Sequence, residues 1–238
     1  MVCAAPLQYQ TQAIATCCTY CQSRGTWYIS CANGHVVCDS CHNQETLAQV
    51  EAILFQAVSS SPLEISEQCM DLPILPMLGC QHAFIAGGAL IAALKNSGAF
   101  NLTNHDIREV LNRTEKQAHG GYCGLTGVCG VVPALGACVA VITGSKCGLD
   151  REQRLTMELV SRVVRAITEL SGPSCCKAYV RISLEVAINF LQATFALPLP
   201  NPDTAICQHM TKHPHGCRKT NCPYYPQSQT TRRKEVQP

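Results

Sequence analysis

The sequence has few charged residues and little excess of either sign. Only 14% of its 238 residues are Asp, Glu, Lys or Arg, and the formal net charge is +2 at pH 7. A marked basic excess is typical of nucleic-acid-binding chains, so such a partner has no support here beyond the short run Arg232-Arg233-Lys234. The chain is 47% apolar, which excludes an intrinsically disordered protein, and its length allows one substantial core with a small appendage.

Long apolar runs and targeting segments are also missing. No stretch approaches the roughly 20 apolar residues that a membrane-spanning helix requires, and residues 131–142 are too few. Residues 1–16 have no basic segment followed by an uninterrupted apolar one, so we expect no export signal and no membrane association. The segment Gly120-Gly121-Tyr122-Cys123-Gly124 lacks the G-x-G-x-x-G order, which argues against a dinucleotide site.

Cysteine, in contrast, is abundant, with 18 in the chain. Clustered cysteines form disulfides in oxidising compartments, and they bind metals or do redox chemistry in reducing ones. Because no export signal is expected, we interpret the chain as a cytoplasmic metalloprotein.

The apolar periodicity predicts a mainly α fold. A helical core domain is expected over residues 44–226, after a small zinc ribbon or knuckle module at 1–43 in which Trp27-Tyr28-Ile29 is the only β-like patch. Residues 203–226 form a Cys/His-rich metal loop within the core domain, and 227–238 form a polar tail.

Helix boundaries are expected at several capping residues. Thr103, with Asp106 three residues later, is expected to cap one helix, and Asp150 to cap a longer one. Pro173 can start the last helix, which the proline-rich segment 197–202 ends.

The N-terminal module contains two Cys-x2-Cys pairs. Each pair directs two thiolates at one ion, so Cys18, Cys21, Cys38 and Cys41 predict a tetrahedral zinc site. With Cys31 and His35 between the pairs, the order resembles the first six ligands of a RING finger. The last Cys-x2-Cys pair of a RING is missing, which weakens a ubiquitin-ligase interpretation. Cys31 and His35 are left as packing residues or as ligands to something that the core contributes.

The core domain has two further cysteine-bearing segments ahead of predicted helices. Cys123 and Cys129 lie in a Gly-rich loop, where the backbone can approach a cluster closely. Cys175 and Cys176 are adjacent, so only one is expected to bind a given ion. The other is free to be a nucleophile, and a helix N-terminus with Lys177 nearby would lower its pKa; alternatively, Lys177 is a solvated residue.

The C-terminal loop contains Cys207, Cys217 and Cys222, the last followed by Pro223. Proline after the final cysteine is typical of iron–sulfur ligation. Three cysteines leave one iron of a four-iron cluster open or need a fourth ligand from the core. Zinc is an alternative, with one of three nearby histidines as fourth ligand: His209, His213 or His215.

These core segments resemble a cysteine-rich prokaryotic family, the domain-of-unknown-function family numbered 5714. The resemblance covers about residues 60–225, and the pieces that carry it are His119-Gly120-Gly121-Tyr122-Cys123-Gly124 with Cys129, Gly172-Pro173-Ser174-Cys175-Cys176-Lys177, and Cys217 with Cys222-Pro223. It implies an anaerobe-associated metabolic or sulfur-handling role and identifies no catalytic residue.

Two functional hypotheses follow for the core. The first is an iron–sulfur enzyme in sulfur transfer, desulfuration or a related lyase step, acting on a small sulfur-containing substrate or with a partner enzyme. Its catalytic candidates are Cys175, Cys176, His119 and Lys177, and its cluster ligands are drawn from Cys123, Cys129, Cys175, Cys207, Cys217 and Cys222. The second is a non-catalytic metal-binding adaptor or redox sensor. An enzyme requires the cysteines to converge on an open cavity with a polar group such as His119.

Overall fold

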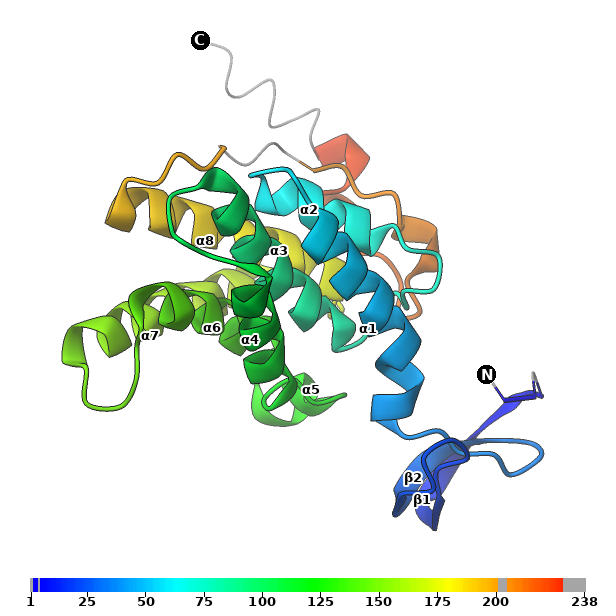
Figure 1. Ribbon diagram of the computed structural model, residues 1–238. Coiled ribbons are helices and arrows are strands. Elements are labelled where there is room, and N and C mark those ends of the chain that lie inside the picture. The colour runs from blue at the N-terminus through cyan, green and yellow to red at the C-terminus, as the bar shows by residue number, and fades with distance from the viewer. Residues whose placement is uncertain (1, 4, 201–204, 229–238) are drawn as a thin grey trace. The chain divides into compact units, whose positions relative to one another are not determined.

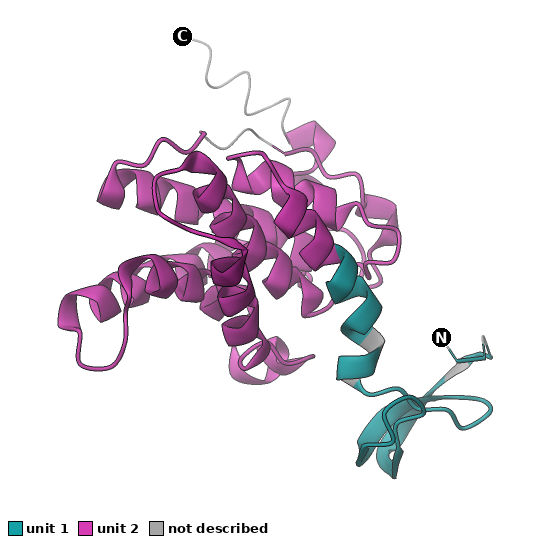
Figure 2. Ribbon diagram, viewed as in Figure 1, with its two compact units in different colours: residues 1–49 teal, residues 50–238 magenta. Residues whose placement is uncertain are grey.

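The computed structural model describes residues 2–3, 5–200 and 205–228. The chain divides into two compact units, residues 1–49 and 50–238 (Figure 2). It is mainly helical, as the periodicity predicted, and its described part contains one sheet of two strands. The predicted tail at 227–238 lies almost wholly outside the described residues.

The smaller unit is built on an antiparallel hairpin of β1 (Leu7–Cys17) and β2 (Arg24–Cys31). Leu7 pairs with Cys31 at one end and Cys17 pairs with Arg24 at the other. Sequence analysis expected strand character only around Trp27 and missed β1. Its residues are mostly exposed and rich in Gln and Thr, so they lack the apolar alternation that marks a half-buried strand. Helix α1 (Asp39–Gln56) begins in this unit and ends in the larger one.

The larger unit is a bundle of helices followed by an irregular segment with two 3₁₀ turns (Figure 1). After the end of α1, its helices and turns are α2 (Pro62–Met70), α3 (Gln81–Ser97), α4 (Asn104–Glu115), α5 (Tyr122–Thr126), α6 (Val131–Thr143), α7 (Asp150–Glu169), α8 (Cys176–Phe195), η1 (Met210–Lys212) and η2 (Lys219–Asn221).

Helix α3 is the centre of the bundle. It is apolar around most of its circumference, and it packs against α2, α4, α6 and α8. Gly87 lets α6 approach closely, because a β-carbon at this position would lie 3.1 Å from the carbonyl oxygen of Ala134. Helix α7 is amphipathic and packs against α6 and α8, with Leu159 and Val163 fully buried.

Of the three helix starts predicted from the sequence, the structure confirms one and differs at the other two. Thr103 forms the predicted capping box, since its hydroxyl accepts from the N–H of His105 at 3.2 Å and its own N–H donates to Asp106 at 2.8 Å. Helix α7 has Leu149 as its N-cap residue, and Asp150 is the first helical residue. The last helix begins at Cys176 instead of Pro173.

The late start of α8 has a specific cause. The carbonyl oxygen of Pro173 accepts a hydrogen bond of 2.7 Å from Arg218, and that of Ser174 lies 3.0 Å from the ring of His213. These contacts to the C-terminal segment hold residues 173–174 outside the helix. No helix in the described part of the chain is long and apolar enough to cross a bilayer.

Candidate metal centres

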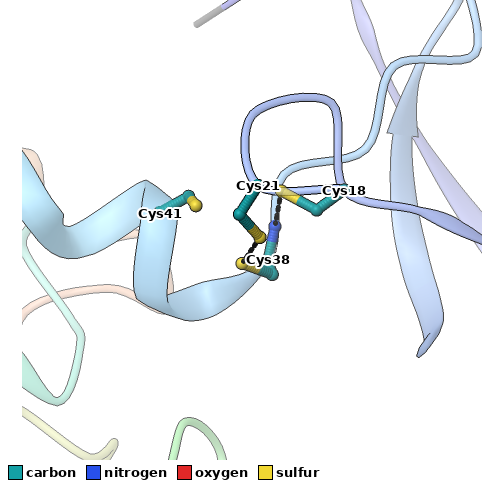
Figure 3. A group of neighbouring side chains, drawn as sticks. All are labelled: Cys18, Cys21, Cys38 and Cys41. Atoms are coloured by element: carbon teal, nitrogen blue, oxygen red, sulfur yellow. Dashed lines mark hydrogen bonds between the residues drawn. The ribbon is translucent and has the colours of Figure 1, made fainter. Parts of the chain in front are cut away.

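The first candidate centre is the four-cysteine group of the smaller unit. Its sulfurs all lie within 4.8 Å of one another, an arrangement that could hold a metal ion (Figure 3). The turn after β1 supplies Cys18 and Cys21, and Cys38 precedes α1, whose first turn supplies Cys41. The sulfurs of Cys21 and Cys38 are 3.6 Å apart. That distance is close to the edge of about 3.8 Å expected for a tetrahedral ion with Zn–S bonds of about 2.3 Å.

Backbone donors and neighbouring thiols shift the pKa values of this group in opposite directions. The backbone N–H of Cys38 donates to Cys18 at 3.3 Å and, with that of Cys21, lowers the pKa of the Cys18 thiol to about 6. The neighbouring thiols of Cys21 and Cys38 raise the pKa of Cys41 to about 12. A bound cation removes this conflict, because it stabilises all four thiolates at once.

A second group in the smaller unit joins Cys31 and His35 to Cys3, and it could also hold a metal ion. The ring nitrogen Nδ1 of His35 lies 3.3 Å from each sulfur, and the two sulfurs are 3.5 Å apart. The sequence left Cys31 and His35 as packing residues or as ligands to something from the core, whereas the structure groups them with Cys3, which the sequence did not point to. The hairpin supplies the partner, because the pairing of Leu7 with Cys31 brings the residues before β1 to the end of β2.

The larger unit has a cavity lined by four cysteines, namely Cys175, Cys207, Cys217 and Cys222. Cys175 is the N-cap residue of α8, and the other three come from the segment after α8. Its other lining residues are Met77, Ala178, Arg181, Met210, His213, Arg218 and Tyr225, and about 370 Å³ of space there is not filled by atoms, including the part that opens to solvent. Of the three histidines considered as a zinc ligand, His213 therefore lines the cavity. Cys175 thus lies where a fourth ligand from the core would have to lie if the C-terminal loop bound a metal.

Each of these four sulfurs accepts a backbone N–H. His209 donates to Cys207 at 3.4 Å and Lys219 donates to Cys217 at 3.3 Å. The amides of Ala178 and Tyr224 donate to Cys175 and Cys222 in the same way. Amide donors around cysteine sulfurs stabilise the thiolate form that binds metal.

Two arginines add positive charge at the same cavity. Arg181 is 1% exposed, donates to the sulfur of Cys207, and makes a two-point ion pair with Glu67 at 2.6 and 2.7 Å. Arg218 also lines the cavity and bonds to Pro173 and Tyr179. A metal group with four thiolate ligands carries net negative charge, which these two guanidinium groups would offset.

Cys123, Cys129 and Cys176 do not line this cavity. Cys176 points elsewhere than its neighbour Cys175, and its sulfur accepts the N–H of Gly79 at 3.5 Å. Of the predicted cluster ligands, the structure thus brings Cys175, Cys207, Cys217 and Cys222 together and places Cys123 and Cys129 outside the set. The backbone conformation at the start of α8 determines which of the two adjacent cysteines faces the cavity. The spacing of cysteines in the sequence does not contain this information.

The predicted catalytic residues lie in different settings. Burial raises the pKa of Cys175, and it raises that of Cys176 to about 12, which is opposite to the lowering that an activated thiol requires. Lys177 is buried and donates to the carbonyl oxygen of Met70 at 2.8 Å, so it is not the solvated residue that sequence analysis allowed. His119 is exposed, with its ring 5.7 Å from that of Tyr122.

A family model described as a family of unknown function (DUF5714) matches residues 50–225. The chain belongs to this family. The match covers the larger unit up to Tyr225 and includes the four-cysteine cavity, whereas the first 49 residues lie outside it. No curated protein and no solved structure shows a significant match to the chain.

Proposed function

We propose that the family domain is an iron–sulfur redox protein, and that its cluster is bound by Cys175, Cys207, Cys217 and Cys222. The observation that carries this proposal is that the four sulfurs line one cavity and that each accepts a backbone N–H. Such a set is suited to a metal group with four thiolate ligands.

The spacing of the sulfurs favours a cluster over a single ion. Among the residues that the structure describes, only the two groups of the smaller unit bring three or more ligand atoms within 4.8 Å of one another. The cavity cysteines are spread more widely, whereas a single zinc ion would draw four sulfurs to about 3.8 Å. A cluster of several irons and sulfides keeps its cysteine ligands further apart than a single ion does.

The completeness of the ligand set favours electron transfer over substrate chemistry. With Cys175 as the fourth ligand, every iron of a four-iron cluster has a thiolate, so no iron is reserved for a substrate. The two arginines that line the cavity would stabilise the added negative charge of the reduced cluster. We propose that the cluster accepts one electron from a reduced donor and passes it to a partner redox enzyme, in a reducing compartment such as the cytoplasm.

In the smaller unit, we propose a structural zinc bound by Cys18, Cys21, Cys38 and Cys41. Four thiolates at tetrahedral spacing leave no open position, which is typical of structural zinc sites. The ion would join the turn after β1 to the start of α1.

Anaerobic metal analysis of the full chain tests the proposal. We expect iron and acid-labile sulfide, thiolate-to-iron absorption in the visible range, and loss of part of that absorption on reduction with dithionite. Cys217→Ala/Cys222→Ala should lose this cluster, whereas Cys147→Ala, at an exposed cysteine outside all of these groups, should keep it. If the wild-type chain contains zinc without iron and the Cys217→Ala/Cys222→Ala variant loses zinc, the proposal is wrong.

A further inference from the structure

Four other cysteines of the larger unit lie near helix starts. Cys80 is the N-cap residue of α3 and Cys176 is the first residue of α8. Cys129 immediately precedes Gly130, the N-cap residue of α6, and Cys123 lies in the short helix α5. They come from segments that are far apart in the sequence, and none of them lines the cavity described above.

Two contacts place these helix starts side by side. The N–H of Gly79, next to Cys80, donates to the sulfur of Cys176 at 3.5 Å, which joins the starts of α3 and α8. A β-carbon at Gly130 would lie 3.2 Å from that of Ala83, which joins the starts of α6 and α3. Helices α3, α6 and α8 also pack against one another in each pairing.

The cysteines at this junction raise one another's thiol pKa values. Burial raises the pKa of Cys129 to about 11, and the nearby thiols of Cys123 and Cys80 raise it further. Burial likewise raises the pKa of Cys176, and Cys129 and Cys123 are among the groups that add to the effect. The contacts between helix starts thus place Cys80, Cys129 and Cys176 at one junction, and Cys123 is near enough to influence two of them. A cation bound among these cysteines would relieve the repulsion between their thiolates.

The backbone around this junction favours an anionic group. Helices α3, α6 and α8 all begin at this junction, and none of them has an acidic residue in its first turn. Two of these junction sulfurs accept backbone donors, Cys129 from Val131 and Cys176 from Gly79. The positive ends of three helix dipoles at one place would stabilise the net negative charge of a thiolate-bound cluster.

We infer that Cys80, Cys123, Cys129 and Cys176 bind a second iron–sulfur cluster. These sulfurs, like those of the first set, are not drawn within 4.8 Å in any group of three, which argues against a single ion. The inference extends the proposed function: consecutive residues, Cys175 and Cys176, would bind the two clusters, and one electron could move from the reduced cluster to the oxidised one.

The cysteines of the two proposed sites differ in their exposure to solvent. Cys123 is exposed, whereas Cys175, Cys207 and Cys222 are buried. The second cluster would thus lie closer to solvent than the first. We assign to it the uptake of single electrons from an external one-electron donor protein, and to the first cluster the transfer of each electron to the partner redox enzyme.

Iron content of matched variants tests this assignment in the full chain. The anaerobically reconstituted wild type should hold about eight irons, as two four-iron clusters. Cys123→Ala/Cys129→Ala and Cys217→Ala/Cys222→Ala should each lower iron and sulfide about twofold, while Cys147→Ala leaves both unchanged. Far-UV circular dichroism checks that each variant is folded; if Cys123→Ala/Cys129→Ala is not, Cys123→Ala alone, at an exposed position, replaces it.

Electron paramagnetic resonance adds a measurement that distinguishes the loss of one cluster from the unfolding of a variant. Two reduced clusters in neighbouring sites should show a magnetically coupled spectrum in the wild type, and each double variant should show a simple spectrum of one cluster. If the wild type contains only about four irons per chain, and only Cys217→Ala/Cys222→Ala loses them, the second site is overturned and the first remains. The same iron lost only in Cys123→Ala/Cys129→Ala would overturn the first site instead, and protein without iron would overturn both.

Discussion

Arg181 is a fully buried guanidinium whose charge is shared between Glu67 and the sulfur of Cys207. Helix α8 supplies the arginine and α2 supplies the glutamate, so this side chain ties the wall of the cavity to a neighbouring helix. The desolvated guanidinium depends on these partners, and removal of one member of a buried ion pair leaves the other uncompensated.

We therefore expect Arg181→Met to destabilise the larger unit. The loss should be about 3 kcal/mol, which for a domain of this size corresponds to a fall of roughly 6 to 12 °C in melting temperature. The matched control is Arg165→Met, which breaks the exposed pair with Glu169 and should cost less than about 1 kcal/mol. Equal melting temperatures for the two variants would contradict the role of Arg181.

Two cysteines of the core are packing residues. Burial raises the pKa of Cys69 to about 12, and burial also raises the pKa of Cys138, whose thiol donates to the carbonyl oxygen of Gly87 at 3.1 Å. Cys138 is fully buried within α6. Neither thiol is available as a thiolate near neutral pH.

Brief alkylation of the native protein at about pH 8, below the reference thiol pKa of about 8.5, should leave Cys69 and Cys138 unmodified. The exposed Cys147 should react within the same pulse. Peptide mass spectrometry locates the label. Modification of Cys138 as fast as that of Cys147 would show that the α3–α6 contact opens readily.

At the scale of elements, the join between α3 and α6 determines where Cys129 lies. Gly130 has no side chain, which lets it lie against Ala118 and Ala83, and a β-carbon there would approach that of Ala118 to 2.8 Å. Gly124, in α5, has open space around it.

Gly130→Ala should therefore displace the loop that contains Cys129. We expect a loss of about 1 to 3 kcal/mol from overpacking, together with lower iron content than in the wild type. Gly124→Ala should be neutral or slightly stabilising, since alanine is favoured over glycine in a helix by about 1 kcal/mol. Thermal unfolding and iron analysis of both variants would check this, and a neutral Gly130→Ala would refute the close contact.

The helices of the larger unit were predictable because their stabilising interactions are local. Apolar residues recur at helical spacing in α1 and α8, and the capping box at Thr103 is encoded within four residues. Strand β1 was not predictable in the same way, since its exposed residues derive their structure from pairing with β2. The true start of α8 also depends on a distant residue, Arg218.

Over the whole molecule, the cysteines fall into sets that belong to different units. The four-cysteine group of the smaller unit followed from the spacing of two Cys-x2-Cys pairs, and the structure brings all four sulfurs together. The partners of the core cysteines could not be deduced in this way. The proposed sets that contain Cys80 and Cys175 depend on how the helices pack, and Cys3 reaches Cys31 through the hairpin.

Because the sets lie in separate units, metal binding in one should not depend on the other. Cys21→Ala/Cys38→Ala should lower zinc by about one per chain without changing iron or sulfide. Elemental analysis of the purified variant measures both. Loss of iron in parallel with zinc would mean that the units are coupled, and unchanged zinc would remove the assignment of the first site.

The central claim is that Cys175, Cys207, Cys217 and Cys222 hold an iron–sulfur cluster. X-ray absorption at the iron and zinc edges of the anaerobic Cys123→Ala/Cys129→Ala variant tests it most directly, because this variant retains that set alone in the core. We predict iron with sulfur neighbours and a further shell of nearby iron, which only a cluster produces. Iron without neighbouring iron, or zinc in excess of what the N-terminal groups can bind and no iron, would contradict the account.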